Sequence, residues 1–156
     1  ENENAAIFLI QKVFKHIKYN LIIAGSEPSE KLIKVVLNHA NISLVKNPDN
    51  NILDKLIQDA HIQVLPTEQD TGIKLKLLKS LYHGRHCIVN RKMINETGLE
   101  KSCAVVESRK QWICKIKELE TVPFEAKDIN LRTELLKPYN CIVQAKKIQA
   151  IIFPQE

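Results

Sequence analysis

The sequence predicts an α/β domain in which a doubly wound, Rossmann-like parallel sheet lies between two layers of helices. Short apolar runs such as NLIIAG and IQVLP are too brief for helices, and each closes at a residue typical of a strand end. Between them lie longer segments whose apolar residues recur with the helical period. Strands that alternate with helices at this spacing favour parallel pairing, because each helix must cross back over the sheet.

The elements are expected in regular alternation along the chain. The expected strands are residues 20–25, 42–46, 62–66, 86–90 and 104–107. The expected helices are residues 5–17, 29–39, 50–59, 72–83, 108–119, 125–136 and 138–152. Asn4, Pro28 and the NPDN turn are typical helix-start signals. No Gly- or Ser-rich linker divides the chain, so residues 1–156 are expected to form one domain.

Two sets of apolar residues are expected to be core. Ala6, Ile10, Val13, Phe14 and Ile17 share one face of the first helix. The single tryptophan, Trp112, lies on a late helix and is expected to pack inside the domain rather than to stack on a ligand.

Composition limits the class of partner. The formal net charge of +5 and the pI near 9.0 favour anionic ligands without requiring nucleic acid, and no nucleic-acid partner is expected. The four cysteines and five histidines lack metal-ligand spacing, so we expect free thiols and no metal site. No apolar run is long enough to cross a bilayer, and the start lacks a signal-peptide pattern. A cytoplasmic location is expected, with peripheral attachment to the inner membrane face left open.

One helix carries its lysines at an unusual place. In the stretch LPTEQDTGIKLKLLKSLYHG, Lys74 and Lys76 lie near the expected helix start, where the helix dipole is already positive. They either belong to a solvated helix face, or they face an anion such as phosphate bound at the helix start. In doubly wound sheets ligands bind beyond the carboxyl ends of the strands, which here lie at Gly25, Lys46, Pro66 and Asn90.

Several stretches together resemble the nucleotide-sugar-binding, C-terminal half of the retaining GT-B glycosyltransferases of group 1. NLIIAGSEP is similar to the family's strand and loop of hydrophobic-Gly-x-x-P type, and NILDKLIQDAHIQVLPT to its helix and Pro-Thr-ended strand. TGIKLKLLKSLYHGRHCIVN resembles the donor-site motif of a glycine, a basic residue and a leucine-rich helix. GLEKSCAVVESRKQWICKIKEL and LLKPYNCIVQAKKIQAII resemble the later strand and the closing helices.

The resemblance implies a hexosyltransferase that moves a sugar from a nucleoside-diphosphate sugar to an acceptor hydroxyl in glycan or polysaccharide synthesis. The donor would be a substrate, with no separate cofactor. The acceptor, a glycan or a lipid-linked sugar, would bind an N-terminal domain that the resemblance places before this chain, together with the first strand of this half. The chain by itself is expected to be inactive.

The resemblance also implies a donor site at the strand ends. Thr71, Gly72, Ile73 and Lys74 would contact the sugar and diphosphate, and Lys46 and Asn47 the nucleobase. The complete set of implied donor-binding residues is Gly25, Ser26, Lys46, Asn47, Pro66, Thr67, Thr71, Gly72, Ile73, Lys74 and Lys76.

The donor motif departs from the family at two positions. Thr71 and Lys79 stand where the family usually carries glutamates, and a lysine cannot accept hydrogen bonds from ribose hydroxyls. The ribose contact would then move to another acid, Glu68 or Glu107. A rival interpretation is a non-catalytic Rossmann-like binding or scaffolding domain with a degenerate donor site. A flavodoxin-like receiver is disfavoured, because the strand ends carry no acidic cluster.

Overall fold

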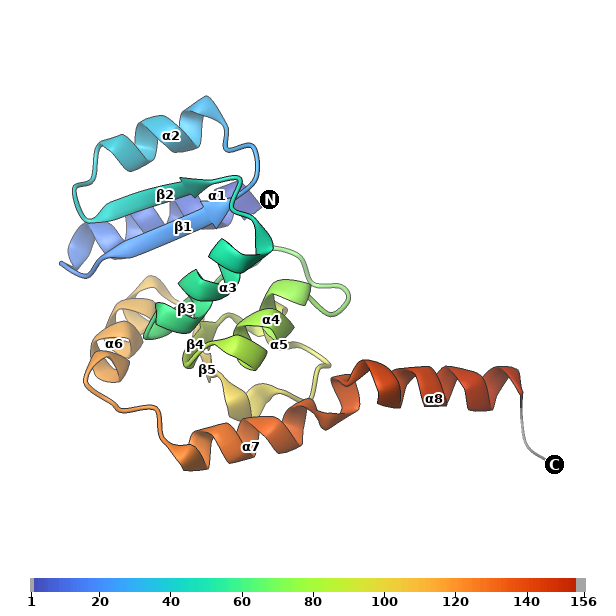
Figure 1. The fold of residues 1–156 in the computed structure, drawn as a ribbon. Helices are drawn as coiled ribbons and strands as arrows, with labels where there is room; N and C mark the ends of the chain where they lie inside the picture. The colour runs from blue at the N-terminus through green and yellow to red at the C-terminus, as the bar shows by residue number, and fades with distance from the viewer. Residues whose placement is uncertain (1, 154–156) are drawn as a thin grey trace. The chain divides into compact units, whose positions relative to one another are not determined.

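The structure is a computed structural model that describes residues 2–153. The chain divides into two compact units, one up to Pro123 and one from Phe124 onward. Figure 1 shows strands and helices in alternation through the first unit, and helices alone in the second.

All strand pairs in the first unit are parallel, which confirms the α/β prediction. The strands form a two-stranded sheet, β1-β2, and a three-stranded sheet, β3-β4-β5, rather than one continuous sheet. Leu21 of β1 pairs with Ile42 of β2, and Ile62 of β3 pairs with His86 of β4. The strands are β1 (Leu21–Gly25), β2 (Ile42–Lys46), β3 (Ile62–Leu65), β4 (His86–Val89) and β5 (Ala104–Val105).

The helices of the first unit follow the strands in the expected order. Within it, α2 packs on β2, α4 on β3, and α6 on β3 and β4. The α-helices are α1 (Asn2–Phe8), α2 (Glu30–Leu37), α3 (Asn50–Asp59), α4 (Leu75–His83), α5 (Arg91–Ile94) and α6 (Arg109–Glu120). The other helical turns are η1 (Leu9–Val13), η2 (Phe14–His16) and η3 (Glu100–Ser102).

Side-chain caps explain where three of these helices begin. Ser29 accepts a hydrogen bond from the Leu32 amide at the start of α2, and Asp49 accepts one from the Ile52 amide at the start of α3. Ser108 and Gln111 form a reciprocal capping box at the start of α6. Such caps satisfy backbone donors that the first helical turn leaves unpaired.

The core of the first unit includes the apolar face expected for the first helical segment. Ile10, Val13, Phe14 and Ile17 are buried in it together with Leu32, Ile88 and Ile116. Trp112 is only 1% exposed, and its ring meets that of Phe8 edge to face at 6.5 Å between centroids. The prediction that Trp112 packs inside the domain is therefore confirmed.

Several expected boundaries were wrong. The first helix begins at Asn2 rather than after Asn4, and it continues as a π-helical and a 3-10 segment to His16 instead of one regular helix. The lysine-bearing helix begins at Leu75, not at residue 72, because Lys74 adopts extended backbone at its N-cap. The short α5 was not predicted, since a four-residue helix is too brief to show an apolar period.

The second unit consists of α7 (Ala126–Leu136), the 3-10 turn η4 (Lys137–Tyr139) and α8 (Cys141–Ile152). Within it, the guanidinium of Arg132 lies over the Phe124 ring at 4.6 Å from the centroid, a cation–π contact. In residues 2–153, no helix combines the length and the hydrophobicity that crossing a bilayer requires.

Candidate functional site

The loops after β1 and β2 are joined by hydrogen bonds at the carboxyl ends of these strands. The Asn47 amide donates to the Gly25 carbonyl at 2.9 Å, and the Asn47 side-chain oxygen accepts from the Glu27 amide at 2.9 Å. Asn47 and Glu27 both have positive φ, which asparagine tolerates better than most residues. The structure therefore brings the predicted residues Gly25, Ser26, Lys46 and Asn47 together at one edge.

Two hydrogen bonds of the Asn90 side-chain amide join the loops that follow β3 and β4. The Asn90 side chain accepts from the Thr67 amide at 3.1 Å and donates to the Thr67 carbonyl at 2.7 Å. Thr67 is buried, and its hydroxyl accepts from the Gln69 amide at 3.2 Å. Thr67 thus shapes the loop after β3, and its partner Asn90 was expected only as a strand end. A polar residue directly after the buried run HCIV was the signal for its role.

Replacing Asn90 by alanine is expected to lower the free energy of unfolding by about 1–3 kcal/mol, because both partners at Thr67 lose their hydrogen bonds in a poorly solvated place. Urea unfolding followed by circular dichroism measures the change. Asn51→Ala, at an exposed position inside α3, is the control and should shift stability by less than about 0.5 kcal/mol. Equal losses in the two variants would contradict the role of Asn90.

The predicted residues in the segment before α4 differ in backbone conformation and in burial. Gly72 has a φ of 69°, the left-handed conformation that glycine adopts without strain, and Ile73 is 51% exposed. Lys74 is only 8% exposed, and its Nζ donates to the carbonyl of Lys92 in α5 at 2.9 Å. Lys74 therefore links the start of α4 to α5. It is a buried lysine and does not lie on a solvent-exposed helix face.

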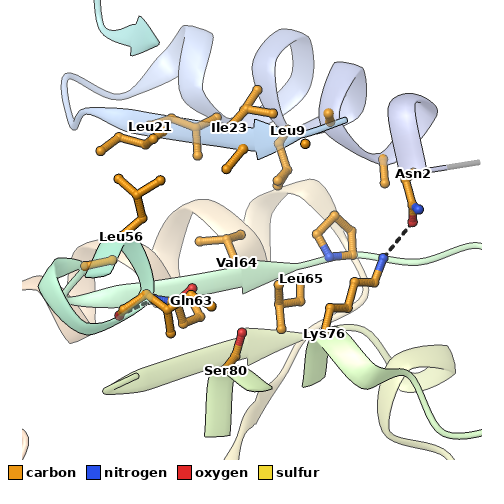
Figure 2. Close-up of a pocket in the computed structure, with 18 of the residues that line it drawn as sticks. Asn2, Leu9, Leu21, Ile23, Leu56, Gln63, Val64, Leu65, Lys76 and Ser80 are labelled. Atoms are coloured by element: carbon orange, nitrogen blue, oxygen red, sulfur yellow. Dashed lines mark hydrogen bonds between the residues drawn. The ribbon is translucent and has the colours of Figure 1, made fainter. Parts of the chain in front are cut away.

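Lys76 lies in the first turn of α4, and its Nζ donates to Oδ1 of Asn2 at 2.9 Å. Figure 2 shows this bond at one end of a groove, with the Lys76 side chain extending beside Leu65. No acidic residue lies in the first turn of α4. Lys76 thus places a cationic side chain in the first turn of α4, where it bonds Asn2.

Three residues discussed for the ribose contact have protein partners. Lys79 lies 2.7 Å from a carboxylate oxygen of Asp54 in α3, so this lysine joins two helices. Glu107 accepts from the Arg91 amide at the start of α5 at 2.6 Å. Glu68 is exposed, and one of its carboxylate oxygens lies 3.7 Å from the Lys92 ammonium. Of the two acids, Glu107 is held by a backbone amide, whereas Glu68 is exposed and pairs with Lys92 at a longer distance.

A groove of about 1290 Å³ opens at the same edge and runs between β1 and β3. Four predicted residues, Gly25, Ser26, Pro66 and Lys76, line it. Figure 2 shows Leu9, Leu21 and Ile23 on one side of this groove and Leu56 and Val64 on the other. The other predicted residues, which are not among its lining residues, are Lys46, Asn47, Thr67, Thr71, Gly72, Ile73 and Lys74.

The far end of the groove is also polar. The Tyr19 hydroxyl donates to a carboxylate oxygen of Glu120 at 3.3 Å, and both residues line the groove. Partial removal of the phenol from water, together with the negative charge of Glu120, raises the pKa of Tyr19, so this hydroxyl keeps its proton at neutral pH.

Within residues 2–153, no three His, Cys, Asp or Glu side chains are grouped so that they could hold a metal ion. The four cysteines are free thiols, of which Cys87 is buried in β4. Arg91 and Lys92 contribute cationic side chains beyond β4 that the donor-site prediction did not include. Their signal was the RK pair directly after the strand HCIVN.

Comparisons with known proteins agree with this architecture. The model of the family described as glycosyl transferases group 1 matches residues 1–121. A solved apo structure of OtsA is similar to 99% of this chain with a TM-score of 0.64 and 14% sequence identity, a likeness that shows the fold. The chain spans 40% of the length of that structure. No curated protein sequence matches the chain.

Proposed function

Because the family model covers residues 1–121, this chain belongs to the group 1 glycosyl transferases, and on that premise we propose that it is the donor-binding domain of a glycosyltransferase. Its ligand in this proposal is a nucleoside-diphosphate sugar, used as a substrate and without a separate cofactor. The acceptor hydroxyl, on a glycan or a lipid-linked sugar, binds a further domain of a longer protein. We place the reaction in polysaccharide or glycan synthesis in the cytoplasm, with peripheral attachment to the membrane.

The observation that carries the proposal is that Gly25 and Ser26, at the carboxyl end of β1, and Pro66 and Lys76, after β3, line one groove at the carboxyl ends of these strands. In doubly wound sheets this is the edge at which phosphorylated ligands bind. A diphosphate at the start of α4 is favoured by the backbone N–H groups and dipole of that nine-residue helix and by the Lys76 ammonium.

These groups suit the leaving group of glycosyl transfer. In the reaction, the bond between the anomeric carbon and the diphosphate oxygen breaks, and the acceptor oxygen bonds to the anomeric carbon as its proton leaves. Negative charge grows on the diphosphate in the transition state. Hydrogen-bond donors that are already positioned where this charge develops lower the activation barrier, typically by a few kcal/mol for each donor. Lys76 and the start of α4 would act in this way, while Lys74 acts indirectly by holding α5 beside them.

Calorimetric titration with uridine, guanosine and adenosine diphosphates tests the proposal. One of the three is expected to bind the folded chain, and Lys76→Ala is expected to weaken its binding about five- to tenfold, up to about 1.4 kcal/mol. Lys34→Ala is the matched control, because Lys34 is exposed on α2 and pairs with Glu30. Its affinity should equal that of the unchanged chain.

Two outcomes would contradict the proposal. In one, the chain is folded by circular dichroism and yet binds none of the three diphosphates at millimolar concentration, which would favour a non-catalytic scaffolding domain. In the other, Lys76→Ala and Lys34→Ala weaken binding equally, which would place the diphosphate elsewhere.

A further inference from the structure

The chain between β3 and α4 includes an exposed loop, residues 68–74. The residues inside it, 69–73, are all exposed. In the part of the chain that the structure describes, residues 70–73 make no hydrogen bond or ion pair with the rest of the fold. This loop carries Thr71 and Gly72, which the family resemblance places at the sugar and diphosphate of the donor. Its conformation therefore depends on how its two ends are held.

One residue of α5, Lys92, contacts both ends of loop 68–74. The Lys92 ammonium donates to the Glu68 carbonyl at 3.3 Å and lies 3.7 Å from a carboxylate oxygen of the same residue. The Lys92 carbonyl accepts from Nζ of Lys74 at 2.9 Å. Lys92 thus bonds the first residue of the loop through its side chain and the last residue through its backbone.

Helix α5 is a fixed support for these bonds, although it has only four residues. Met93 and Ile94, which follow Lys92, are both 0% exposed. The Arg91 amide, which precedes Lys92, donates to the Glu107 carboxylate at 2.6 Å. The backbone of Lys92 is therefore held on both sides. Its side chain is 44% exposed and reaches the loop from this support.

Fixing the ends of a loop favours binding at the residues between them. Ordering a residue costs conformational entropy, and a ligand that must order a mobile loop binds less tightly for that reason. A loop that is already bonded at both ends leaves less of this cost to the ligand. An exposed ion pair such as that of Lys92 and Glu68 adds little to global stability. The effect of the Lys92 side chain is therefore expected in the loop rather than in global unfolding.

We propose that Lys92 is a positioning residue of the donor site. Its ammonium holds loop 68–74 at Glu68 and its carbonyl holds the loop at Lys74, so that Thr71 and Gly72 meet a nucleoside-diphosphate sugar in one conformation. Lys92 acts through the loop and does not itself contact the donor. The inference rests on the proposed function, because the loop matters for binding only if the donor lies at the start of α4.

The first test needs no ligand and measures backbone order parameters of residues 70–72 by NMR relaxation. Lys92→Met keeps the apolar stem and the carbonyl but removes the ammonium. The order parameters are expected to fall from about 0.85, typical of a rigid backbone, toward about 0.6. Lys92→Arg retains a cation that can reach Glu68 and should restore them. Lys101→Met, which removes the same charge from an exposed lysine of η3, is the matched control and should leave them unchanged. No fall in Lys92→Met would overturn the proposal.

The second test is a double-mutant cycle on the affinity for uridine, guanosine or adenosine diphosphate, whichever binds the unchanged chain. Lys92→Met is expected to weaken binding about two- to fivefold, and Lys101→Met to leave it unchanged. Glu68→Gln should weaken it less, because the bond from Lys92 to the Glu68 carbonyl remains. The double variant should bind as Lys92→Met does, since both changes remove one shared contact.

Two results of this cycle would contradict the role of Lys92. Losses that add in the double variant would mean that Lys92 and Glu68 act independently of one another. Tighter binding by Glu68→Gln, together with weaker binding by Lys92→Met, would mean that the Lys92 ammonium acts directly on the diphosphate. Both results leave the proposed function intact. That function fails instead if the folded chain binds none of the three diphosphates, and the relaxation measurement then still decides whether Lys92 holds the loop.

Discussion

Replacing Trp112 by alanine is expected to lower the free energy of unfolding by about 3–5 kcal/mol, a larger loss than that expected for Asn90→Ala. Trp112 is 1% exposed in the core of the first unit, where its ring meets Phe8. Truncation removes that buried surface and leaves a cavity that the neighbouring helices can only partly close. Urea unfolding followed by far-ultraviolet circular dichroism gives the value.

Two further variants serve as comparisons for Trp112→Ala. Trp112→Phe keeps most of the volume and should lose clearly less than Trp112→Ala. Leu37→Ala removes a side chain that is 79% exposed on α2 and should change stability by less than about 0.5 kcal/mol. A loss below about 1 kcal/mol for Trp112→Ala would mean that this helix is not docked on the sheet.

Replacing Lys74 by methionine is expected to cost about 1.5–3 kcal/mol of stability, the usual worth of a hydrogen bond to a charged group. The Lys74 ammonium donates to the Lys92 carbonyl, and the side chain is 8% exposed. Methionine retains an apolar stem of similar length, so the change isolates the lost bond. Lys34→Met, on an exposed and solvated lysine of α2, is the control for removing a charge.

The same variant separates two roles for Lys74. If Lys74 acts by tying the start of α4 to α5, Lys74→Met loses stability, while diphosphate affinity per folded molecule falls by less than it does in Lys76→Ala. Unchanged stability with a large loss of affinity would contradict this role and would instead place the Lys74 ammonium on the diphosphate.

Local patterns in the sequence were enough to predict most elements. Apolar period and cap chemistry placed α3 at its observed bounds and α6 within one residue, because Asp49 and Ser108 are caps that act within a single turn. The same reasoning failed before α4, where extended backbone at Lys74 delays the helix. Nothing within a few residues of Lys74 reveals its partner, because the Lys92 carbonyl lies eighteen positions further along the chain.

The candidate site, like the fold, could be predicted only in part from the sequence. The order of strands and helices alone predicted a ligand site at the strand ends, among them Gly25 and Pro66. Ser26 and Lys76 were predicted from the family resemblance, and all four residues line the groove. Which polar groups shape the site did not follow from that order. Asn90 holds Thr67, Asp54 pairs with Lys79, and Glu107 caps α5, and each of these contacts joins separate elements.

The sequence by itself determined the class of fold, the parallel strands and the buried face around Ile10 and Trp112, because these depend on the period and polarity of neighbouring residues. Only the tertiary structure decided that the strands form two sheets with a groove between them, and that Lys74 bonds the Lys92 carbonyl while Lys76 bonds Asn2 at the groove. The physical reason is that pairing edges and ammonium partners come from segments distant in the chain, whose meeting is set by packing rather than by local propensity.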